Sequence, residues 1–551
     1  MKRLYGNTVG LKANQIRRLE NFYRRRIQPQ FLISAELSRD LKLLSDEIRR
    51  QIGLLVNRQG KVVYVVVGDH KKIVIPAISE YRAAPGRLNG LRCIHTHLTA
   101  ESLTNDDLTD LALLRLDMMA AVASGETELH PHIHIAHILP KNTHNHSYRI
   151  LDPLTSSQLN IDCLAMILAL EAELARMSKG YSADSGKERA LLASVSSTSK
   201  RKALDSLVEL KALADSNQIE IVGSLVQQRK SIRKQRFIGP GKLQELAIMA
   251  LQEAATVIIF DQELSPSQIR TITDQIELKV IDRTQLILDI FAQRAKTREG
   301  KLQVELAQLK YLLPRLILKN TAMSRLTGGI GGRGPGETKL EINRRRARNR
   351  IARLEQELLA VRKHRKQQRA QRQKKGLPII SIIGYTNAGK STLLNTLTRS
   401  NVLAESRLFA TLDPTSRRLK FPKDSEVIIT DTVGFIKDLP TDLLVAFRAT
   451  LEELESADLL LHVIDISNHQ YGSQIDSVEG ILGDLKLQHT RTIRVLNKID
   501  RVDPHKISDL ARKLNGKAIC AKQKSTLIPL IKQMEAILFE KSILKANTYG
   551  S

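Results

Sequence analysis

The octapeptide GYTNAGKS has the residue types and spacing of a loop that surrounds phosphate groups. An apolar run, PIISII, comes before it, and the residues after it predict a helix beginning near Ser391. In this context the loop N–H groups and the helix N-terminus face a phosphate, the lysine adds a positive charge, and the serine hydroxyl is available to Mg²⁺. The predicted phosphate-binding residues are Gly384, Tyr385, Thr386, Asn387, Ala388, Gly389, Lys390 and Ser391.

Two later segments follow in the order that a nucleotide site requires. A predicted strand, VIIT, ends in DTVG, where Asp431 would hold Mg²⁺ through water and the Gly434 N–H would meet the γ-phosphate. Another, IRVL, ends in NKID, where a carboxylate would accept hydrogen bonds from guanine, whereas adenine would leave it unpaired. The site is therefore predicted to take GTP. The predicted contacts are Asp431, Thr432, Val433, Gly434, Asn497, Lys498, Ile499 and Asp500.

Together these motifs resemble those of the translation-factor-type GTPases. The resemblance implies a threonine that closes on Mg²⁺ and the γ-phosphate, which we expect to be Thr411, with Thr415 as the competing choice. It also implies a loop that contacts guanine through a backbone N–H, and here KAICAKQK has Cys520 where a serine is usual. The added nucleotide contacts are Phe409, Ala410, Thr411, Leu412, Asp413, Cys520, Ala521 and Lys522, and the implied Mg²⁺ ligands are Ser391, Thr411 and, through water, Asp431.

The residue after DTVG departs from the pattern of many GTPases, which place there a glutamine that orients the attacking water. This chain has Phe435, whose apolar side chain cannot activate water. We predict slow intrinsic hydrolysis that accelerates when a partner orders the site or supplies a group, and the catalytic residue stays unknown. The alternative is that Phe435 is a core residue and that another group positions the water.

Composition limits the kind of partner. The chain of 551 residues has 86 Lys and Arg against 58 Asp and Glu, a net charge of +28. This charge favours a polyanionic partner, which would be RNA, DNA or an anionic membrane, over a basic protein without such a partner. Aromatic residues are scarce and Trp is absent, so a nucleic acid would be held through its backbone. The three cysteines do not have the spacing of metal ligands and cannot all form disulfides, which fits a protein of the reducing cytosol. Without a signal core or a long apolar run, we expect a cytoplasmic protein with no membrane span.

Periodicity predicts an α/β protein of several domains. In the first, strands are expected at 61–69, 71–78, 91–98 and 132–140, and a helix at 106–124. Strand–helix alternation then predicts a small α/β domain. Two helical patterns with a glycine loop between them predict an antiparallel hairpin. The expected divisions are 1–187, an extra α+β domain; 188–291, an α/β subdomain; 292–376, the basic hairpin; 377–541, the nucleotide domain; and 542–551, a tail.

From Glu188 to about Glu540 the sequence closely resembles the HflX family of the Obg–HflX group of ribosome-associated GTPases. The resemblance rests on FIGPGKLQEL, FDQELSPSQIR, GGIGGRGPGETKLE and LFATLDPTSRR as well as on the nucleotide motifs. It implies a P-loop GTPase domain with a mostly parallel sheet covered by helices on both faces. It further implies a cytoplasmic protein that binds the large ribosomal subunit and ribosomal RNA, not DNA, and splits stalled or stressed ribosomes. We expect a monomer.

The glycine loop in the hairpin is a different kind of site. Six of the nine residues at 328–336 are glycine, but no apolar strand precedes them and no Gly-Lys-Ser ends them. From Arg344 to Lys375 there are fourteen basic and two acidic residues. We therefore expect an RNA-facing tip, where glycines permit close backbone approach, rather than a flexible turn without contacts. The predicted tip residues are Gly328, Gly329, Gly331, Gly332, Arg333 and Gly334.

The N-terminal segment lies outside this resemblance. Its LRCIHTHLTAESLTNDDL is faintly similar to JAB/JAMM metalloproteases, with His95 and His97 on one strand face, Asp107 as a carboxylate and Thr104 in the place of a serine. The spacing is one residue short, and the expected upstream glutamate falls near Arg50 and Gln51, neither of which is a base. We predict a degenerate, non-catalytic domain. A second histidine row, His130, His132 and His134, is also expected to be structural.

Two other functions stay open at this point. One is an RNA-remodelling protein in which FIGPGKLQEL forms a second, ATP-binding loop, although GPGK lacks the full pattern. The other is a metal-dependent peptidase with an appended switch, which would need a complete metal site. A measurement of nucleotide specificity would distinguish the RNA-remodelling protein from a GTP-driven ribosome factor. A measurement of bound metal would test the peptidase.

Overall fold

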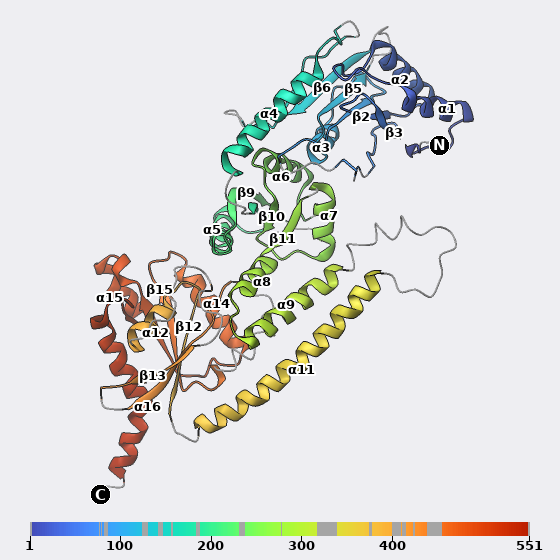
Figure 1. Ribbon diagram of the computed structural model, residues 1–551. Coiled ribbons are helices and arrows are strands. Elements are labelled where there is room, and N and C mark those ends of the chain that lie inside the picture. The colour runs from blue at the N-terminus through green and yellow to red at the C-terminus, as the bar shows by residue number, and fades with distance from the viewer. Residues whose placement is uncertain are drawn as a thin grey trace. The chain divides into compact units, whose positions relative to one another are not determined.

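The computed structural model (Figure 1) divides the chain into two compact units, described separately below. The first comprises Met1–Lys211 and Gln218–Ile281, and the second Ala212–Asn217 and Asp282–Ser551. The structure describes residues 3–76, 78, 80–81, 86–123, 131–141, 147–155, 158–182, 188–230, 237–276, 278–316, 339–373, 377–398, 409, 415–422, 425–437 and 454–548. Among these residues, no helix is long and apolar enough to cross a membrane.

The first unit begins with a mixed sheet of seven strands in the order β1-β3-β2-β4-β5-β6-β7. Alternate residues of the five central strands enter two separate cores, one with α1 and α2 and the other with α3, and α4 contributes to both. The strands are β1 (Tyr5–Gly6), β2 (Ile52–Asn57), β3 (Val62–Val67), β4 (Leu91–Thr96), β5 (Met118–Ala123), β6 (His132–Ile138) and β7 (Tyr148–Ile150). The helices are α1 (Ala13–Asn21), η1 (Phe22–Arg24), α2 (Ala35–Ile48), α3 (Asn105–Leu113) and α4 (Cys163–Ser182).

Two local predictions in this sheet are wrong. The helix predicted at 106–124 ends at Leu113, and Met118–Ala123 is a buried strand between β4 and β6. An apolar run that is buried on both sides carries no periodicity that separates strand from helix. The strand predicted at 71–78 is also missing from its described residues. The Asp69 carboxylate instead accepts hydrogen bonds from the N–H groups of Lys71 and Lys72 and fixes a turn.

A second sheet of the first unit has the order β11-β10-β8-β9, and its β10–β8 and β8–β9 pairs are parallel. The strand–helix alternation predicted for this segment is therefore present. Its elements are β8 (Arg189–Ser196), α5 (Lys200–Ser216), β9 (Glu220–Gln228), α6 (Pro240–Gln252), β10 (Val257–Phe260), α7 (Pro266–Ile276) and β11 (Lys279–Asp282). Ile248 and Leu251 of α6 share a core with Leu108 and Leu111 of α3, so the two sheets belong to one packed body.

From Asp282 onward, the second unit contains α8 (Arg283–Arg294) and then a helical hairpin of α9 (Arg298–Leu316) and α11 (Lys339–Gln373). The two hairpin helices run side by side (Figure 1) and are joined by a small leucine core. Arg350 of α11 donates two hydrogen bonds to Glu305 of α9, at 2.7 and 2.8 Å. This leucine seam buries one side of the very basic helix α11, which its composition alone would leave in solvent.

The hairpin continues into a six-stranded sheet in the order β13-β14-β12-β15-β16-β17. In this sheet only β13 and β14 pair antiparallel. Helices α12 and α16 pack on the sheet in one core, and α14 and α15 pack on it in another, so helices cover both faces as predicted. α16 continues into the segment assigned to the tail. The elements are β12 (Ile379–Gly384), α12 (Lys390–Thr398), β13 (Thr415–Lys420), β14 (Glu426–Asp431), β15 (Leu459–Asp465), α14 (Tyr471–Asp484), β16 (Thr492–Asn497), η2 (Ile499–Arg501), α15 (Pro504–Lys513), β17 (Gly516–Ala518), η3 (Lys524–Leu527) and α16 (Ile528–Thr548).

Candidate nucleotide site

The GYTNAGKS loop joins the carboxyl end of β12 to the first turn of α12. Two of its glycines are required by the backbone. Gly384 has φ +144°, and a Cβ there would lie 2.2 Å from the Val463 carbonyl oxygen of β15. Gly389 has φ +98°, and a Cβ there would lie 2.3 Å from Asn497 Nδ2. The loop is thus pressed against the neighbouring strands, with its N–H groups at the helix start, as a phosphate cradle requires.

Lys390 and Ser391, at the start of α12, both interact with Asp431 of β14. Ser391 Oγ donates to Asp431 Oδ2 at 2.6 Å, which brings together the two residues expected beside Mg²⁺. Lys390 Nζ donates to the Tyr385 carbonyl oxygen at 2.8 Å. Burial lowers the pKa of Lys390 to about 8, against the opposing effect of Asp431. A buried ammonium beside one carboxylate is a site prepared for additional negative charge.

The DTVG segment lies directly against the loop. A Cβ on Gly434 would come within 2.8 Å of Thr386 Cγ2 and 3.0 Å of Lys390 Nζ, so only glycine permits this approach. Thr432 Oγ1 donates to the Ile382 carbonyl oxygen at 2.7 Å and fastens the segment to β12. The Thr386 hydroxyl oxygen is buried and has no hydrogen-bond partner among the described residues. A polar atom left in this state indicates that the loop faces a polar ligand.

Asn497 connects three segments that the sequence leaves far apart. Its Nδ2 donates to the Ala388 carbonyl oxygen of the phosphate loop at 2.8 Å, and its Oδ1 accepts from the Ala521 N–H at 2.9 Å. Thr396 of α12 donates to the Ala521 carbonyl oxygen at 2.6 Å. Sequence reasoning placed Asn497 in the site but missed this bridging role, and it missed Thr396, for which no sequence signal existed.

The rest of the predicted base-recognition region lies around the end of β16. Lys498 has φ +65° and forms a 2.7 Å ion pair with Asp465 at the end of β15, which directs its side chain along the sheet edge. Asp500 is exposed in η2, where a base could reach it. The Cys520 N–H donates to Thr526 Oγ1 at 3.0 Å. The N–H groups of Cys520 and Ala521 are therefore both engaged within the protein, and these contacts use the backbone of Cys520 and not its side chain.

Some predicted contacts lie outside the described residues, namely Ala410, Thr411, Leu412, Asp413, and the tip residues Gly328, Gly329, Gly331, Gly332, Arg333 and Gly334. Thr415, the competing choice for Thr411, is the first residue of β13 and pairs with Asp431. Phe409 is described and buried, with φ +56°.

Phe435 belongs to the core. Its side chain is 2% exposed, its N–H donates to the Gly384 carbonyl oxygen at 3.1 Å, and its carbonyl oxygen accepts from the Thr386 N–H at 2.8 Å. The geometry supports the alternative that Phe435 fixes DTVG to the phosphate loop while a different group positions water.

Acid is expected to destabilise this sheet below pH 6.5 through His462 of β15. The side chain is buried, and burial, followed by the charges of Arg494 and Lys390, lowers its pKa to about 4. The unfolded chain then binds a proton that the folded chain excludes, so stability is lost as the pH falls from 6.5 towards 4, by on the order of 3 kcal/mol when complete. Urea unfolding at pH 7 and at about pH 4.5 measures this loss.

His462→Gln removes this titration and should lose less stability between the two pH values than the unchanged chain. His489→Gln, which changes an exposed histidine of the same domain, should retain the full loss. Equal pH dependence in all three proteins would contradict the assignment to His462.

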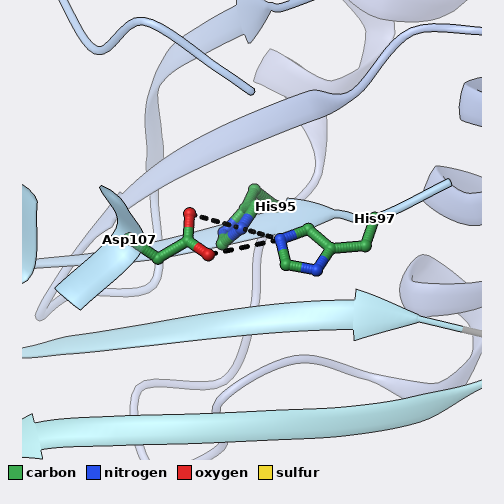
Figure 2. Close-up of side chains that lie close together, drawn as sticks. All are labelled: His95, His97 and Asp107. Atoms are coloured by element: carbon green, nitrogen blue, oxygen red, sulfur yellow. Dashed lines mark hydrogen bonds and ion pairs between the residues drawn. The ribbon is translucent and has the colours of Figure 1, made fainter. Parts of the chain in front are cut away.

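In the first unit, His95, His97 and Asp107 also come together, with both rings aimed at the carboxylate (Figure 2). Of the second histidine row, His132 and His134 lie on one face of β6, and His130 lies outside the described residues. The GPGK sequence does not form a phosphate loop. The Gly239 N–H donates to Gln227 Oε1 at 2.9 Å, and Lys242 pairs with Glu245 on the surface.

The sheet is mostly parallel, its glycine loop leads into α12, DTVG lies against that loop, and NKID follows β16. These features define a P-loop GTP-binding protein. Family models agree along the chain. Residues 204–292 match the GTP-binding GTPase N-terminal family, 294–372 the GTP-binding GTPase middle region, and 379–498 the 50S ribosome-binding GTPase family.

Curated relatives are more specific. The chain is 48% identical over 358 residues to a GTPase HflX of Caldanaerobacter subterraneus, covering 65% of this chain and 82% of the relative. It is 47% identical over 302 residues to the GTPase HflX of Escherichia coli, covering 55% and 71%. The chain therefore belongs to the HflX family of GTPases. It is a GTP hydrolase that uses GTP and Mg²⁺.

Among solved structures, a GTP-binding protein from Sulfolobus solfataricus in complex with GDP is 26% identical. It covers 63% of this chain and 99% of its own, with a TM-score of 0.35.

Proposed function

We propose that this GTPase binds the large ribosomal subunit and couples GTP binding and hydrolysis to the splitting or recycling of stalled ribosomes. The observation that carries the proposal is the direct connection between the basic helix and the nucleotide sheet. α11 ends at Gln373 and β12, which leads into the phosphate loop, begins at Ile379. The match of 379–498 to a family described as 50S ribosome-binding supports the same partner.

The nucleotide would be held by the roles that the geometry supports. The loop N–H groups and Lys390 would take the β- and γ-phosphates, and Asp500 would read guanine. Ser391, Thr411 and, through water, Asp431 would hold Mg²⁺, and the close Ser391–Asp431 pair fits that ion. Mg²⁺ supplies positive charge that neutralises the phosphates. The protein's own contribution is to position the nucleotide-binding groups. Gly434, which has no side chain, allows the DTVG segment to approach Lys390 closely.

The hairpin supplies a surface suited to ribosomal RNA. One side of α11 is covered by α9, and Arg345, Arg346 and Arg348 are exposed. The acidic residues of this stretch are already engaged, because Glu355 pairs with Lys310 and Glu357 with Arg353. The exposed charge is therefore nearly all positive, and guanidinium groups bind phosphate in a forked geometry.

A packed aromatic pair would couple the conformation of the nucleotide site to that of the hairpin. Phe291 of α8 meets Phe409 edge-to-face at 4.6 Å between ring centroids. Phe409 lies two residues before the predicted Mg²⁺ ligand Thr411, and α8 leads directly into α9. Movement of this segment with the nucleotide state would therefore act on the start of the hairpin.

Phe291→Ala is expected to reduce the stimulation of GTP turnover by large subunits several-fold while changing turnover of the isolated protein little. The aromatic contact is lost, but no residue of the nucleotide loops is altered. Phe421→Ala is the matched control, since it breaks another aromatic pair in the same unit, between buried Phe421 and half-buried Phe539. Steady-state turnover with and without subunits checks the prediction, and equal loss of stimulation in both variants would contradict it.

The proposed partner is tested by GTP turnover of the protein alone, with large subunits and with intact ribosomes. We expect stimulation by large subunits and its loss on deletion of 328–336, because the tip would no longer reach RNA. Light scattering would follow the separation of intact ribosomes into subunits. Turnover unaffected by subunits, or equal use of ATP, would overturn the proposal and favour RNA remodelling.

A further inference from the structure

Three side chains with metal-ligand chemistry meet on the α3-covered face of the first sheet (Figure 2). His95 and His97 come from the end of β4, and Asp107 comes from the first turn of α3. The two histidine Nε2 atoms are 2.9 Å apart, and they lie 3.2 and 3.3 Å from the two carboxylate oxygens. All three residues are buried.

We propose that His95, His97 and Asp107 bind one divalent transition-metal ion, Zn²⁺ by preference, with a water as its fourth ligand. Tetrahedral zinc with bonds of about 2.0–2.1 Å has ligand atoms about 3.3 Å apart. The observed separations of 2.9 to 3.3 Å are close to that edge length. A site with three protein ligands leaves the fourth position to water.

The tautomer of His97 supports this assignment. Its Nδ1 lies 3.2 Å from the Glu101 carbonyl oxygen, which can only accept a hydrogen bond. Nδ1 therefore carries the proton, and in the neutral ring Nε2 presents a lone pair to the centre of the cluster. A ring nitrogen that donates to a backbone carbonyl while the other faces the ion is the usual arrangement of a metal-bound histidine.

Without a cation, the His97 Nε2 lone pair lies 3.3 Å from a carboxylate oxygen, which is also an acceptor. The donor within reach is His95 Nε2, at 2.9 Å, and its single proton would be divided between His97 Nε2 and Asp107 Oδ1. A metal ion would bind both lone pairs and the carboxylate at once. The competing arrangement is a protonated His97 paired with Asp107, which would bind no metal.

Hydrogen bonds from Thr104 also fix the position of the Asp107 carboxylate. Thr104 donates to Asp107 Oδ2 from its N–H at 2.7 Å and from its hydroxyl at 2.8 Å. These contacts begin α3 and fix the carboxylate towards the histidines, as outer partners of metal ligands do. Two imidazoles with one carboxylate suit zinc better than Mg²⁺ or Ca²⁺, which prefer oxygen ligands. The centre is thus chemically distinct from the Mg²⁺ site of the nucleotide domain.

The inferred centre is an ion-binding site and not a peptidase. A hydrolytic centre needs a base for the metal-bound water. Arg50 and Gln51, where the resemblance would place one, cannot serve and are engaged elsewhere. Arg50 donates to the carbonyl oxygens of Asn7 and Val9, and Gln51 donates to that of Lys71. The ion would instead join β4 to α3, the helix that packs on α6 of the adjacent α/β sheet.

The test uses the full chain, stripped with a chelator, desalted, and titrated with Zn²⁺, with bound metal measured by elemental analysis. We expect one zinc per chain, and affinity at least tenfold lower in His97→Gln and in Asp107→Asn. Substituted Co²⁺ should give the strong visible absorption of a four-coordinate ion, which both variants should lose. His137→Gln, at another buried histidine of the same sheet, and Lys390→Ala, in the nucleotide loop, should bind zinc normally.

Circular dichroism and thermal unfolding of the same samples show whether each variant folds, so loss of metal is not confused with loss of structure. Failure of the unchanged chain to bind zinc would overturn the inference, as would undiminished zinc in both ligand variants. Neither result depends on ribosome binding, so the outcome is independent of the proposed function.

Discussion

Asp500→Asn is expected to lower GTP affinity by two to four orders of magnitude and to create affinity for xanthosine triphosphate. A carboxylate that accepts two hydrogen bonds from guanine contributes roughly 1.5–3 kcal/mol for each. The amide would present a donor to guanine's amine, whereas xanthine has a carbonyl oxygen at that position. Asp500 is exposed at the end of β16, so the substitution should leave the fold intact. Competition of both nucleotides against a fluorescent GTP analogue measures the change.

Asp503→Asn is the control for this experiment. Asp503 lies three residues further on and caps α15 by accepting from the His505 N–H at 3.1 Å, a role that asparagine can also fill. Its nucleotide preference should remain that of the unchanged chain. If Asp500→Asn kept full preference for GTP, the assignment of base recognition to Asp500 would be wrong.

Asn497→Ala is expected to weaken both the fold and the nucleotide site. The side chain is 2% exposed and is the shared partner of Ala388 and Ala521. Its removal leaves a buried carbonyl oxygen and a buried N–H unpaired, at about 1–3 kcal/mol each. We expect the free energy of unfolding of the nucleotide domain to fall by that order, and GTP affinity to fall at least tenfold. Urea denaturation and GTP titration measure the two effects.

Asn497→Asp provides an internal comparison. The aspartate can still accept from Ala521 but cannot donate to Ala388, so it should retain part of the stability. Asn57→Ala removes two hydrogen bonds from an exposed turn of the first unit and should leave GTP affinity unchanged. A normal GTP affinity in Asn497→Ala would show that the bridge does not position the loop.

Local patterns in the sequence were sufficient to predict most of the strands, loops and helices around the nucleotide site. GYTNAGKS, DTVG and NKID each follow an apolar run, and the structure places them at the ends of β12, β14 and β16. Such motifs are readable because each combines a strand, a turn and a helix start within a few residues. Predictions failed where burial removed the periodic signal, as in β5, or where a side chain stopped a strand, as Asp69 does.

Residue type therefore determined that this chain has a GTP site, a basic hairpin and a histidine pair with a downstream carboxylate. Tertiary structure alone decided that Asn497 bridges the phosphate loop to Ala521, that Phe435 is buried, and that Asp107 meets His95 and His97. Each of these depends on contacts between segments separated by 10 to 109 positions. A sequence pattern records the order of residues along one strand or helix, whereas the packing of sheets and helices determines which side chains from different segments meet.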